Sequence, residues 1–232
     1  MDGPQRDIME RVEAGLKTRL YDTGRMGRMH RVPVMVAALA LISACTSGPG
    51  APDQTAQLKD LADTRTATER FMREGENSPI PPDKRHTLLP LRYFDPDLSF
   101  STAAQLDLTE AAKRPVAEMP TSTGSIARYE RVGFLRFTLK GQQYTLGAFV
   151  PEGTQRISEL FVPFADETSG SETYAAGRYL NLQPTSTGLY QIDFNYAYNP
   201  YCAYNKEYEC PYPPPGNRLK VPIRAGEKVP VS

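Results

Sequence analysis

"RVGFLRFTLKGQQYTLGAFV", residues 131–150, decides the fold class of this chain. Apolar and polar side chains alternate on both sides of Lys140-Gly141. The apolar positions are Leu135, Phe137 and Leu139 before this pair, and Tyr144, Leu146 and Ala148 after it. Successive side chains of a β-strand point to opposite faces, so each half is predicted to be a strand, with Lys140-Gly141 as the tight turn between them. The stretch therefore predicts an antiparallel hairpin.

Further strands are predicted on both sides of this hairpin, separated by turn residues. They are Gln105–Leu108, Leu160–Phe164, Arg178–Leu182, Leu189–Phe194 and Leu219–Arg224. No helical pattern lies between them, and parallel strands need long crossovers, so antiparallel pairing is expected. The predicted fold is mainly β, or α+β by content: a curved antiparallel sheet, a sandwich or an open barrel, with one N-terminal helix and two long loops.

The one predicted helix precedes the strands. Asp53 can cap its start, and Gly75 can end it before a proline-rich segment. Its apolar stripe is narrow, so we expect the helix to pack on the sheet rather than to build a core of its own. The stripe consists of Leu58, Leu61, Thr68, Phe71 and Met72.

The N-terminal region has the features of an export signal. A basic segment, Arg25 to Arg31, precedes the apolar run Val32–Ile42, which is shorter than the roughly 20 residues of a membrane-spanning helix. Ile42–Cys45, with the sequence ISAC, resembles the bacterial lipobox, whose cysteine becomes the lipid-modified N-terminus. The alternatives are an ordinary signal peptide with an unmodified Cys45 and an uncleaved anchor. Lipidation is the preferred interpretation, because several acyl chains would hold the domain firmly at a membrane.

These features predict four parts of the chain. They are a non-native extension at 1–25, a lipoprotein signal peptide at 26–44, a flexible Gly/Pro-rich tether at 45–54 and a single β-rich domain at 55–228. Thr46 follows the cysteine, in place of the Asp that retains such proteins at the inner membrane. We therefore expect a cell-envelope location, with the periplasmic side of the outer membrane preferred over the inner membrane.

The charge of the chain does not indicate a nucleic-acid partner. Residues 1–44 hold seven Lys/Arg and five Asp/Glu, which leaves 20 against 22 in the remainder, a net charge of 20 − 22 = −2. A nucleic-acid-binding surface needs an excess of positive charge. The predicted partners are instead the membrane, through Cys45, and a small polar or glycan ligand.

That ligand site is predicted where two long connections, Ala165–Tyr179 and Asn195–Arg218, leave the ends of strands. Loops of more than about 12–15 residues without structure are uncommon in compact domains unless they have a function. Carboxylate, guanidinium and amide groups could orient a polar ligand there, and tyrosines could stack on a sugar. The alternative is that these side chains satisfy backbone groups of the loops. The six candidates are Glu172, Arg178, Asp193, Asn195, Tyr198 and Asn199.

Four blocks of the sequence resemble a bacterial family known as domain of unknown function 1684. They are LRYFDPD, RVGFLRFTL, LFVPFADETSGSETYAAGRYLNL and IDFNYAYNPYCAYNKEYECPYPPPGNRLKVPIRAGE, and the similarity covers about residues 55–228. The resemblance implies a β-rich fold with no agreed substrate or mechanism. The chain departs from the usual pattern at Ala165, Asn181 and Gly216, where Arg, Asp and Glu are common.

Cys202 and Cys210 lie in the last of these blocks and could form a disulfide, bind a metal or provide a reactive thiol. In an exported domain a disulfide is the preferred interpretation, with an expected stabilisation of about 2–3 kcal/mol. A zinc site at the two cysteines lacks further ligands. A calcium site at Asp166–Glu172 lacks the regular spacing of an EF-hand loop, so no metal or cofactor is predicted. A reactive thiol would need a cation beside Cys202, and Lys206 is the only one nearby in sequence.

No sequence motif identifies a reaction. His86, the one histidine after Cys45, lies in a polar proline-flanked segment and is expected to be exposed. The preferred interpretation is a lipid-anchored binding or accessory protein of unknown activity. The alternative is an envelope enzyme in which Glu172 or Asp193 acts as acid or base, assisted by Arg178. A scaffold without any ligand is the third possibility.

Overall fold

The computed structural model describes residues 53–108, 113–185 and 187–231. The expected extension at 1–25, the signal peptide at 26–44, the lipidation site Cys45 and most of the tether at 45–54 lie outside these residues. The sheet belongs to a compact unit that spans Leu58–Ser232.

Within the described residues, seven strands, two α-helices and five short 3₁₀ turns follow one another along the chain. The helices are α2 (Gln54–Glu74) and α3 (Arg85–Leu88). The strands are β1 (Ser101–Asp107), β2 (Val116–Pro120), β3 (Ile126–Leu139), β4 (Gln142–Pro151), β5 (Leu160–Phe164), β6 (Arg178–Leu182) and β7 (Tyr190–Asp193). The 3₁₀ turns are η1 (Pro82–Lys84), η2 (Leu98–Phe100), η3 (Phe194–Tyr196), η4 (Tyr201–Ala203) and η5 (Pro215–Asn217).

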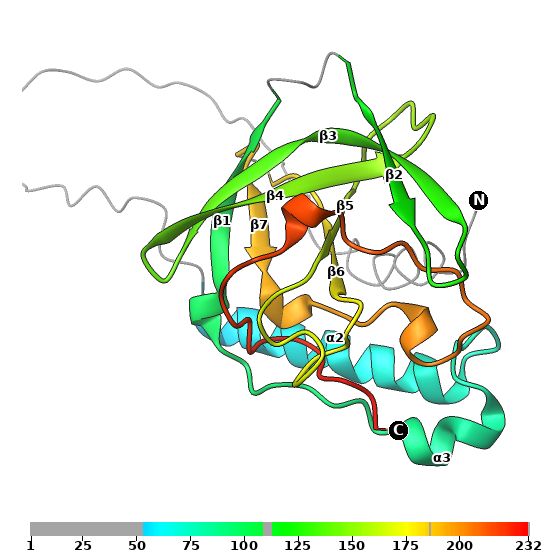
Figure 1. The fold of residues 1–232 in the computed structure, drawn as a ribbon. Coiled ribbons are helices and arrows are strands. Elements are labelled where there is room, and N and C mark those ends of the chain that lie inside the picture. The colour runs from blue at the N-terminus through cyan, green and yellow to red at the C-terminus, as the bar shows by residue number, and fades with distance from the viewer. Residues whose placement is uncertain (1–52, 109–112, 186, 232) are drawn as a thin grey trace, which may run out of the picture. The chain divides into compact units, whose positions relative to one another are not determined.

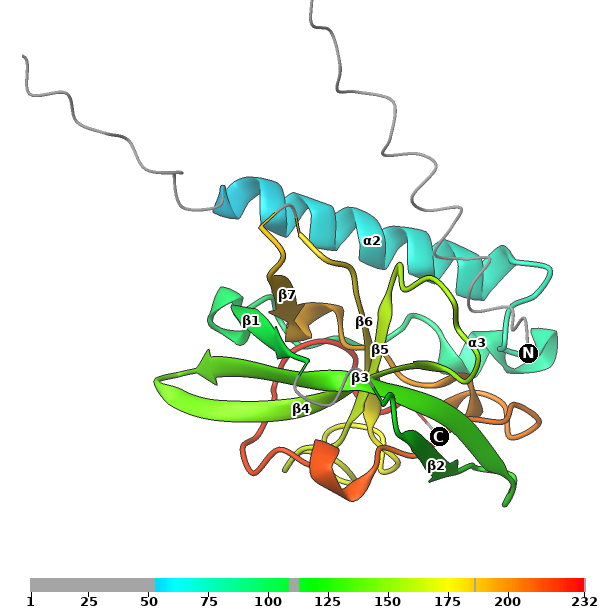
Figure 2. The same ribbon diagram turned by 90° about the horizontal axis from the view of Figure 1, so that it is seen from above.

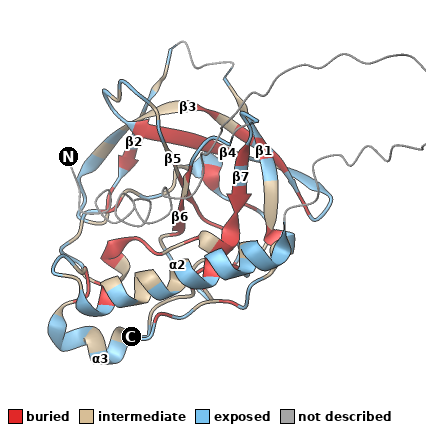
Figure 3. Cartoon of the chain, turned by 180° about the vertical axis from the view of Figure 1, so that it is seen from behind, coloured by how far each residue is buried: buried red, intermediate tan, exposed pale blue. Residues whose placement is uncertain are grey.

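The predicted hairpin is confirmed as the β3–β4 pair, which is the longest pairing in Figure 1. Lys140 and Gly141 both have positive φ, at 49° and 81°, which is the geometry of a tight turn that matches the twist of the strands. Alternate residues of both strands face the interior, where Leu135 and Leu146 are fully buried. Figure 3 shows buried stretches together with intermediate and exposed ones along these strands.

All described pairings between named strands are antiparallel, and the strand order is β6-β5-β4-β3-β1-β7. Beyond β6, Pro184 forms an isolated bridge with Tyr190 of β7, so the two ends of the sheet meet and the barrel is nearly closed. The mainly β fold with one N-terminal helix is therefore confirmed, in its barrel form. Apolar side chains from six strands fill the interior, among them Ala104, Leu135, Ala148, Val162, Leu180 and Ile192.

The predicted helix is also confirmed, as α2. The Asp53 side chain accepts a hydrogen bond from the Thr55 N–H at 3.0 Å, and Gly75 donates the last N–H of the helix to Phe71 at 2.8 Å. In Figures 1 and 2, α2 lies on the side of the sheet away from the β3–β4 hairpin. Arg65 of α2 contacts connecting segments, since it donates to the carbonyls of Phe94 and Asn195.

Three local expectations were wrong. Leu58 of the apolar stripe is exposed, although Leu61 and Met72 are buried. Strand β2 was missed, since its five residues offer only one buried position, Met119. Leu219–Arg224 is not a strand, because its backbone groups bond instead to the segment around Ala165 and Asp166.

Over the described ranges, no helix has the length and apolar character that crossing a membrane would require.

Candidate functional site

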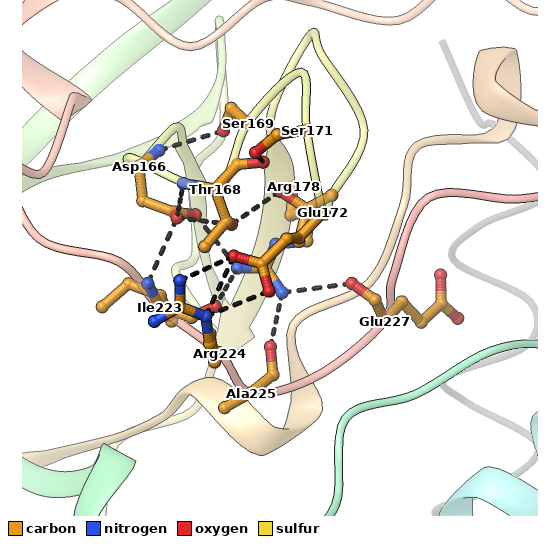
Figure 4. A network of polar contacts seen from close by, with 11 residues as sticks. Asp166, Thr168, Ser169, Ser171, Glu172, Arg178, Ile223, Arg224, Ala225 and Glu227 are labelled. Atoms are coloured by element: carbon orange, nitrogen blue, oxygen red, sulfur yellow. Dashed lines mark hydrogen bonds and ion pairs between the residues drawn. The ribbon is translucent and has the colours of Figure 1, made fainter.

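The best-formed polar cluster in the described residues surrounds Arg178, the first residue of β6 (Figure 4). Its side chain is completely buried. One guanidinium nitrogen, Nη2, donates to Asp166 Oδ2 at 3.0 Å and to the carbonyl of Ile223 at 2.8 Å. The other, Nη1, donates to the carbonyls of Ala225 and, at 3.1 Å, Glu227. Arg178 therefore fastens a C-terminal strap, residues 217–229, to the sheet.

Asp166 is the counter-charge of Arg178 and organises the loop that precedes β6. Its Oδ1 accepts from the N–H and hydroxyl of Thr168, at 2.8 and 2.6 Å, and from the N–H of Ile223 at 3.2 Å. Burial lowers the pKa of Arg178, and the Asp166 carboxylate opposes that shift. A buried ion pair is favourable only when hydrogen bonds satisfy its other polar atoms. Most side-chain polar atoms of Arg178 and Asp166 have such partners. Of the atoms of this pair, Arg178 Nε is buried without a hydrogen bond.

Glu227 is a second buried carboxylate, which the sequence analysis missed. Its Oε2 accepts from the N–H of Asn199 at 2.8 Å and from the Tyr204 hydroxyl at 2.7 Å, and its Oε1 accepts from Tyr93 at 3.3 Å. Burial raises the pKa of Glu227, while these donors and the Arg178 charge lower it. The side chain ties the strap to two distant segments. We call Asp166, Arg178, Glu227 and their direct partners the Arg178 network.

Of the six predicted site residues, Glu172 lies at the surface. Both of its carboxylate oxygens accept from Nε of Arg224, at 2.9 and 3.0 Å. This contact lowers the pKa of Glu172, so the side chain is held as an anion by an exposed partner. Such a carboxylate does not have the raised pKa of a general acid.

Asp193 and Asn195 are buried together at the end of β7. The Asp193 carboxylate accepts from the backbone N–H of Asn195 at 2.9 Å and from its amide at 2.7 Å. The Asn195 amide also exchanges two hydrogen bonds with the backbone of Asp97, both at 2.9 Å. The expected alternation, with Phe194 on the opposite face, ends here because residues 194–196 form the 3₁₀ turn η3. These two side chains cap a turn and join two segments.

Tyr198 and Asn199 have separate partners. The Tyr198 hydroxyl donates to Asn181 Oδ1 at 3.1 Å. The Asn199 amide donates to the carbonyl of Lys228 at 2.8 Å and to the hydroxyl of Tyr204 at 3.3 Å. Of the six, Arg178 and Asn199 belong to the Arg178 network and Asp193 and Asn195 form a separate pair, so the six side chains do not converge at one place. Their hydrogen bonds agree instead with the alternative that they stabilise long loops.

The two long connections do come together, as expected. Residues Tyr179 and Tyr198 form a backbone bridge, and the hydroxyl of Tyr174 lies 3.9 Å from the sulfur of Cys202. A hollow among the described residues lies over β1, β3 and β4. It measures about 270 Å³ and is lined by polar groups such as Gln105, Arg136 and Thr145.

Cys202 and Cys210 are both buried, and the Cys202 N–H donates to the sulfur of Cys210 at 3.1 Å. The two sulfurs are not bonded in the structure. Hydrogen bonds from Cys210, Ser122 and Tyr174 lower the pKa of Cys202 to about 7, and no cation is among the groups that lower it. The pKa of Cys210 is raised by its contact with Cys202 and by burial. The geometry does not provide the cation that a reactive thiol was expected to need.

His86 lies exposed on the short helix α3, as expected. Among the described residues, no group of three or more His, Cys, Asp or Glu side chains is arranged to hold a metal ion. In the Asp166–Glu172 stretch, which was considered for calcium, Asp166 pairs with Arg178 and Glu172 pairs with Arg224.

The chain is similar to a protein family and to a solved structure. A family model described as "Protein of unknown function (DUF1684)" matches residues 87–228. The chain belongs to the DUF1684 family. A similar solved structure is that of an uncharacterised protein from the gene locus rrnAC0354 of Haloarcula marismortui. It is 37% identical, has a TM-score of 0.60, and the match covers 76% of this chain and 96% of that one. No curated protein matches.

The matched DUF1684 region contains the whole sheet and both buried carboxylates of the Arg178 network. Sequence reasoning selected Arg178 but missed Asp166 and Glu227 as its partners. The signal available was the length of the resembling blocks, which extend through the strap although it has no strand pattern.

Proposed function

We propose that this DUF1684 protein is a lipid-anchored cell-envelope protein that acts by binding. The observation that carries the proposal is the sequence Ile42–Cys45 directly after a basic segment and a short apolar run. Cys45 would become the modified N-terminus. Helix α2 begins at Gln54, nine positions later, so a short tether would separate the folded unit from the membrane.

Binding is preferred to catalysis because of the state of the candidate acids and bases. Glu172 is ion-paired at the surface, and Asp193 is engaged by Asn195. A general acid or base must reach a substrate with a pKa matched to its task. The pKa of Glu172 is lowered, and Asp193 accepts two hydrogen bonds from Asn195 at a turn, so neither carboxylate provides support for the enzyme hypothesis. The position of Thr46 after Cys45 favours the periplasmic side of the outer membrane as the destination.

The anchor is tested with Cys45→Ala in a bacterial host that has an outer membrane. The wild-type protein should sediment with membranes and incorporate radiolabelled palmitate, whereas Cys45→Ala should incorporate none and leave the membrane fraction. Thr46→Asp is the matched variant, because it keeps the lipidated cysteine and should move the protein to the inner membrane. Retention of Cys45→Ala in the membrane fraction would contradict the proposal.

We further propose that Cys202 and Cys210 form a disulfide in the exported protein. The support is their position: both are buried, and the N–H of one contacts the sulfur of the other. An oxidising envelope favours the bond, and closing the short loop between them should stabilise the fold by about 2–3 kcal/mol.

A further inference from the structure

Cys202 and Cys210 lie in a short segment, residues 201–210, which we call the cysteine loop. The N–H of Cys202 donates to the sulfur of Cys210 at 3.1 Å, and the rings of Tyr201 and Tyr208 meet edge to face with their centroids 5.3 Å apart. The loop is therefore folded on itself, and its two thiols are hydrogen-bonded to each other. Its two halves are attached to different parts of the molecule.

The half that contains Cys210 is attached to the sheet. Ser122, in the turn between β2 and β3, donates its N–H to the carbonyl of Cys210 at 3.0 Å. The hydroxyl of Ser122 accepts from the N–H of Cys210 at 3.1 Å. Just after the loop, the N–H of Tyr212 donates to the carbonyl of Pro120, the last residue of β2, at 2.8 Å. Strand β2 is paired with β3 along its length, so this half of the loop is fixed to the sheet.

The half that contains Cys202 is attached to the strap. Tyr204, two positions after Cys202, is buried, and its hydroxyl donates to Oε2 of Glu227 at 2.7 Å. The same oxygen accepts from the N–H of Asn199 at 2.8 Å, just before the loop. Tyr204 therefore connects the cysteine loop to the strap.

An S–S bond between the two cysteines joins these two attachments covalently. Because Cys210 is fixed to the β2–β3 turn, the bond also fixes Cys202 and, two residues later, Tyr204 relative to the sheet. Without the bond, noncovalent contacts alone keep Tyr204 on Glu227, and segments held by few contacts open more often. The redox state of the pair should therefore be transmitted to the strap.

We propose that Cys202 and Cys210 form a thiol–disulfide switch that controls how often the strap opens, through the contact between Tyr204 and Glu227. The strap stays closed in the oxidised protein and opens more often in the reduced protein. Opening removes the strap carbonyls from Arg178, so the switch reaches the Arg178 network. This inference rests on the proposed disulfide and adds what that bond controls.

The exchange chemistry needs the two thiols and a disulfide oxidant. The hydrogen bond with Cys210 lowers the pKa of Cys202 to about 7, so Cys202 loses its proton first. Its sulfur attacks one sulfur of the oxidant, and the other sulfur leaves as a thiolate. Cys210 then loses its proton and attacks the Cys202 sulfur, which releases the second thiolate. One S–S bond breaks in the oxidant, one forms in the protein, and the two protons pass to the released thiolates.

The test uses the full chain with Cys45→Ala, in which Cys202 and Cys210 are the remaining cysteines. The result then does not depend on the anchor. Oxidised glutathione and dithiothreitol set the two redox states, and mass spectrometry after thiol alkylation reports which state is present. Hydrogen exchange, also followed by mass spectrometry, then compares the strap with the β3–β4 hairpin.

The strap offers amides that report its opening. The N–H groups of Glu227 and Lys228 donate to the carbonyls of Ala197 and Arg92, both at 2.8 Å. These amides should exchange about tenfold faster in the reduced protein, because local opening exposes them. Exchange in the hairpin should change little, since its hydrogen bonds do not depend on the strap.

Three variants make the result specific. Tyr204→Phe keeps the ring but removes the hydroxyl that contacts Glu227, so its strap should exchange quickly in both redox states. Cys202→Ser should keep the strap in the fast-exchanging state in either buffer. Tyr212→Phe removes the hydroxyl of an exposed tyrosine just after the loop and should respond to reduction as the parent chain does.

The inference is overturned if the bond forms but the strap exchanges equally in both states, or if strap and hairpin speed up by the same factor. It is also overturned if Tyr204→Phe responds to reduction like the parent chain. Each of these results leaves the proposed disulfide intact. Two alkylated thiols after treatment with oxidised glutathione would instead exclude the disulfide, and the inference with it.

Discussion

The barrel interior and the Arg178 network are both buried, but the sequence builds them in different ways. The interior is assembled from neighbouring strands, such as β3 and β4, which are joined by the two-residue turn at Lys140-Gly141. The network joins residues far apart: Arg178 bonds to Asp166 on one side and to Ile223, Ala225 and Glu227 on the other. The local alternation of apolar and polar residues predicts the strands of the sheet, whereas polar contacts between distant residues attach the strap to it.

The two regions should also respond differently to damage. An apolar interior loses stability in proportion to the contacts that are removed. A buried polar network is more sensitive, because removal of one partner leaves other charged or polar groups without hydrogen bonds. The predictions below test this difference.

The largest effect is expected for Arg178→Ala. The change leaves the Asp166 carboxylate and three strap carbonyls buried without the guanidinium, so the free energy of unfolding should fall by about 3–5 kcal/mol. Urea denaturation followed by circular dichroism measures it. Arg224→Ala is the control, since its ion pair with Glu172 is exposed and should show no resolvable change. A wild-type unfolding curve for Arg178→Ala would contradict the role of the network.

Leu146→Ala tests the interior. Leu146 of β4 is completely buried in the barrel interior, and its truncation should lower the free energy of unfolding by about 3 kcal/mol. The same denaturation experiment applies, with Thr145→Ala, an exposed neighbour, as the matched control. If Leu146→Ala proves far more damaging than Arg178→Ala, the comparison between the two regions is reversed.

The cysteine pair should give a smaller effect. If the disulfide forms, reduction should lower the free energy of unfolding by about 2–3 kcal/mol, and Cys202→Ser/Cys210→Ser should behave like the reduced protein. Mass spectrometry of the exported protein after thiol alkylation gives the redox state. Two alkylated thiols in freshly isolated protein would exclude the bond.

The two glutamates should show opposite pH dependence. Burial raises the pKa of Glu227 above its ordinary value of 4.5, so its contribution to stability is fully present below that value and is lost as the pH rises through the raised pKa. Glu227→Gln should flatten the decline in stability toward neutral pH. Melting temperatures from acid to neutral pH measure this slope, and an unchanged slope would mean that the donors around Glu227 cancel the effect of burial.

Glu172 should show the opposite pH dependence to Glu227, and its effect on stability should be the smallest of those predicted here. Arg224 lowers its pKa, so its contribution is present above the ordinary value of 4.5 and is lost as the pH falls through the lowered pKa. Glu172→Gln should therefore flatten only the acid side of the same melting curve. Because both partners are exposed, the change should be small and should disappear at high salt.

The sequence predicted the parts of the fold that depend on local pattern. Residues 131–150 carry their alternation and their turn within 20 positions, and Asp53 and Gly75 mark the helix ends directly. Leu219–Arg224 has the composition of a strand, but its backbone partners are the loop at Ala165 and the side chains of Asp166 and Arg178. Nothing in the local pattern distinguishes these partners from a neighbouring strand.

The candidate site was less predictable for the same reason. Glu227 stands in the sequence RAGEK, which is typical of an exposed loop. It is buried because Gly226, with φ of 77°, lets the strap pass close to the carbonyls of Phe194 and Ala197, where a Cβ atom would lie within 2.7 Å of both. Asp193 and Asn195 were predicted as ligand-binding residues, and in the structure they are buried, where Asn195 bonds to the backbone of Asp97, almost 100 positions away.

The strap completes the hydrogen bonding of Arg178 only after the sheet has been synthesised. Residues 217–229 follow every strand in the sequence, so a ribosome produces them after the whole sheet, yet they supply the carbonyls that satisfy Arg178. Until they arrive, a guanidinium that ends up fully buried has only Asp166 to neutralise it. The full burial of Arg178 therefore depends on the last described segment of the chain to be synthesised.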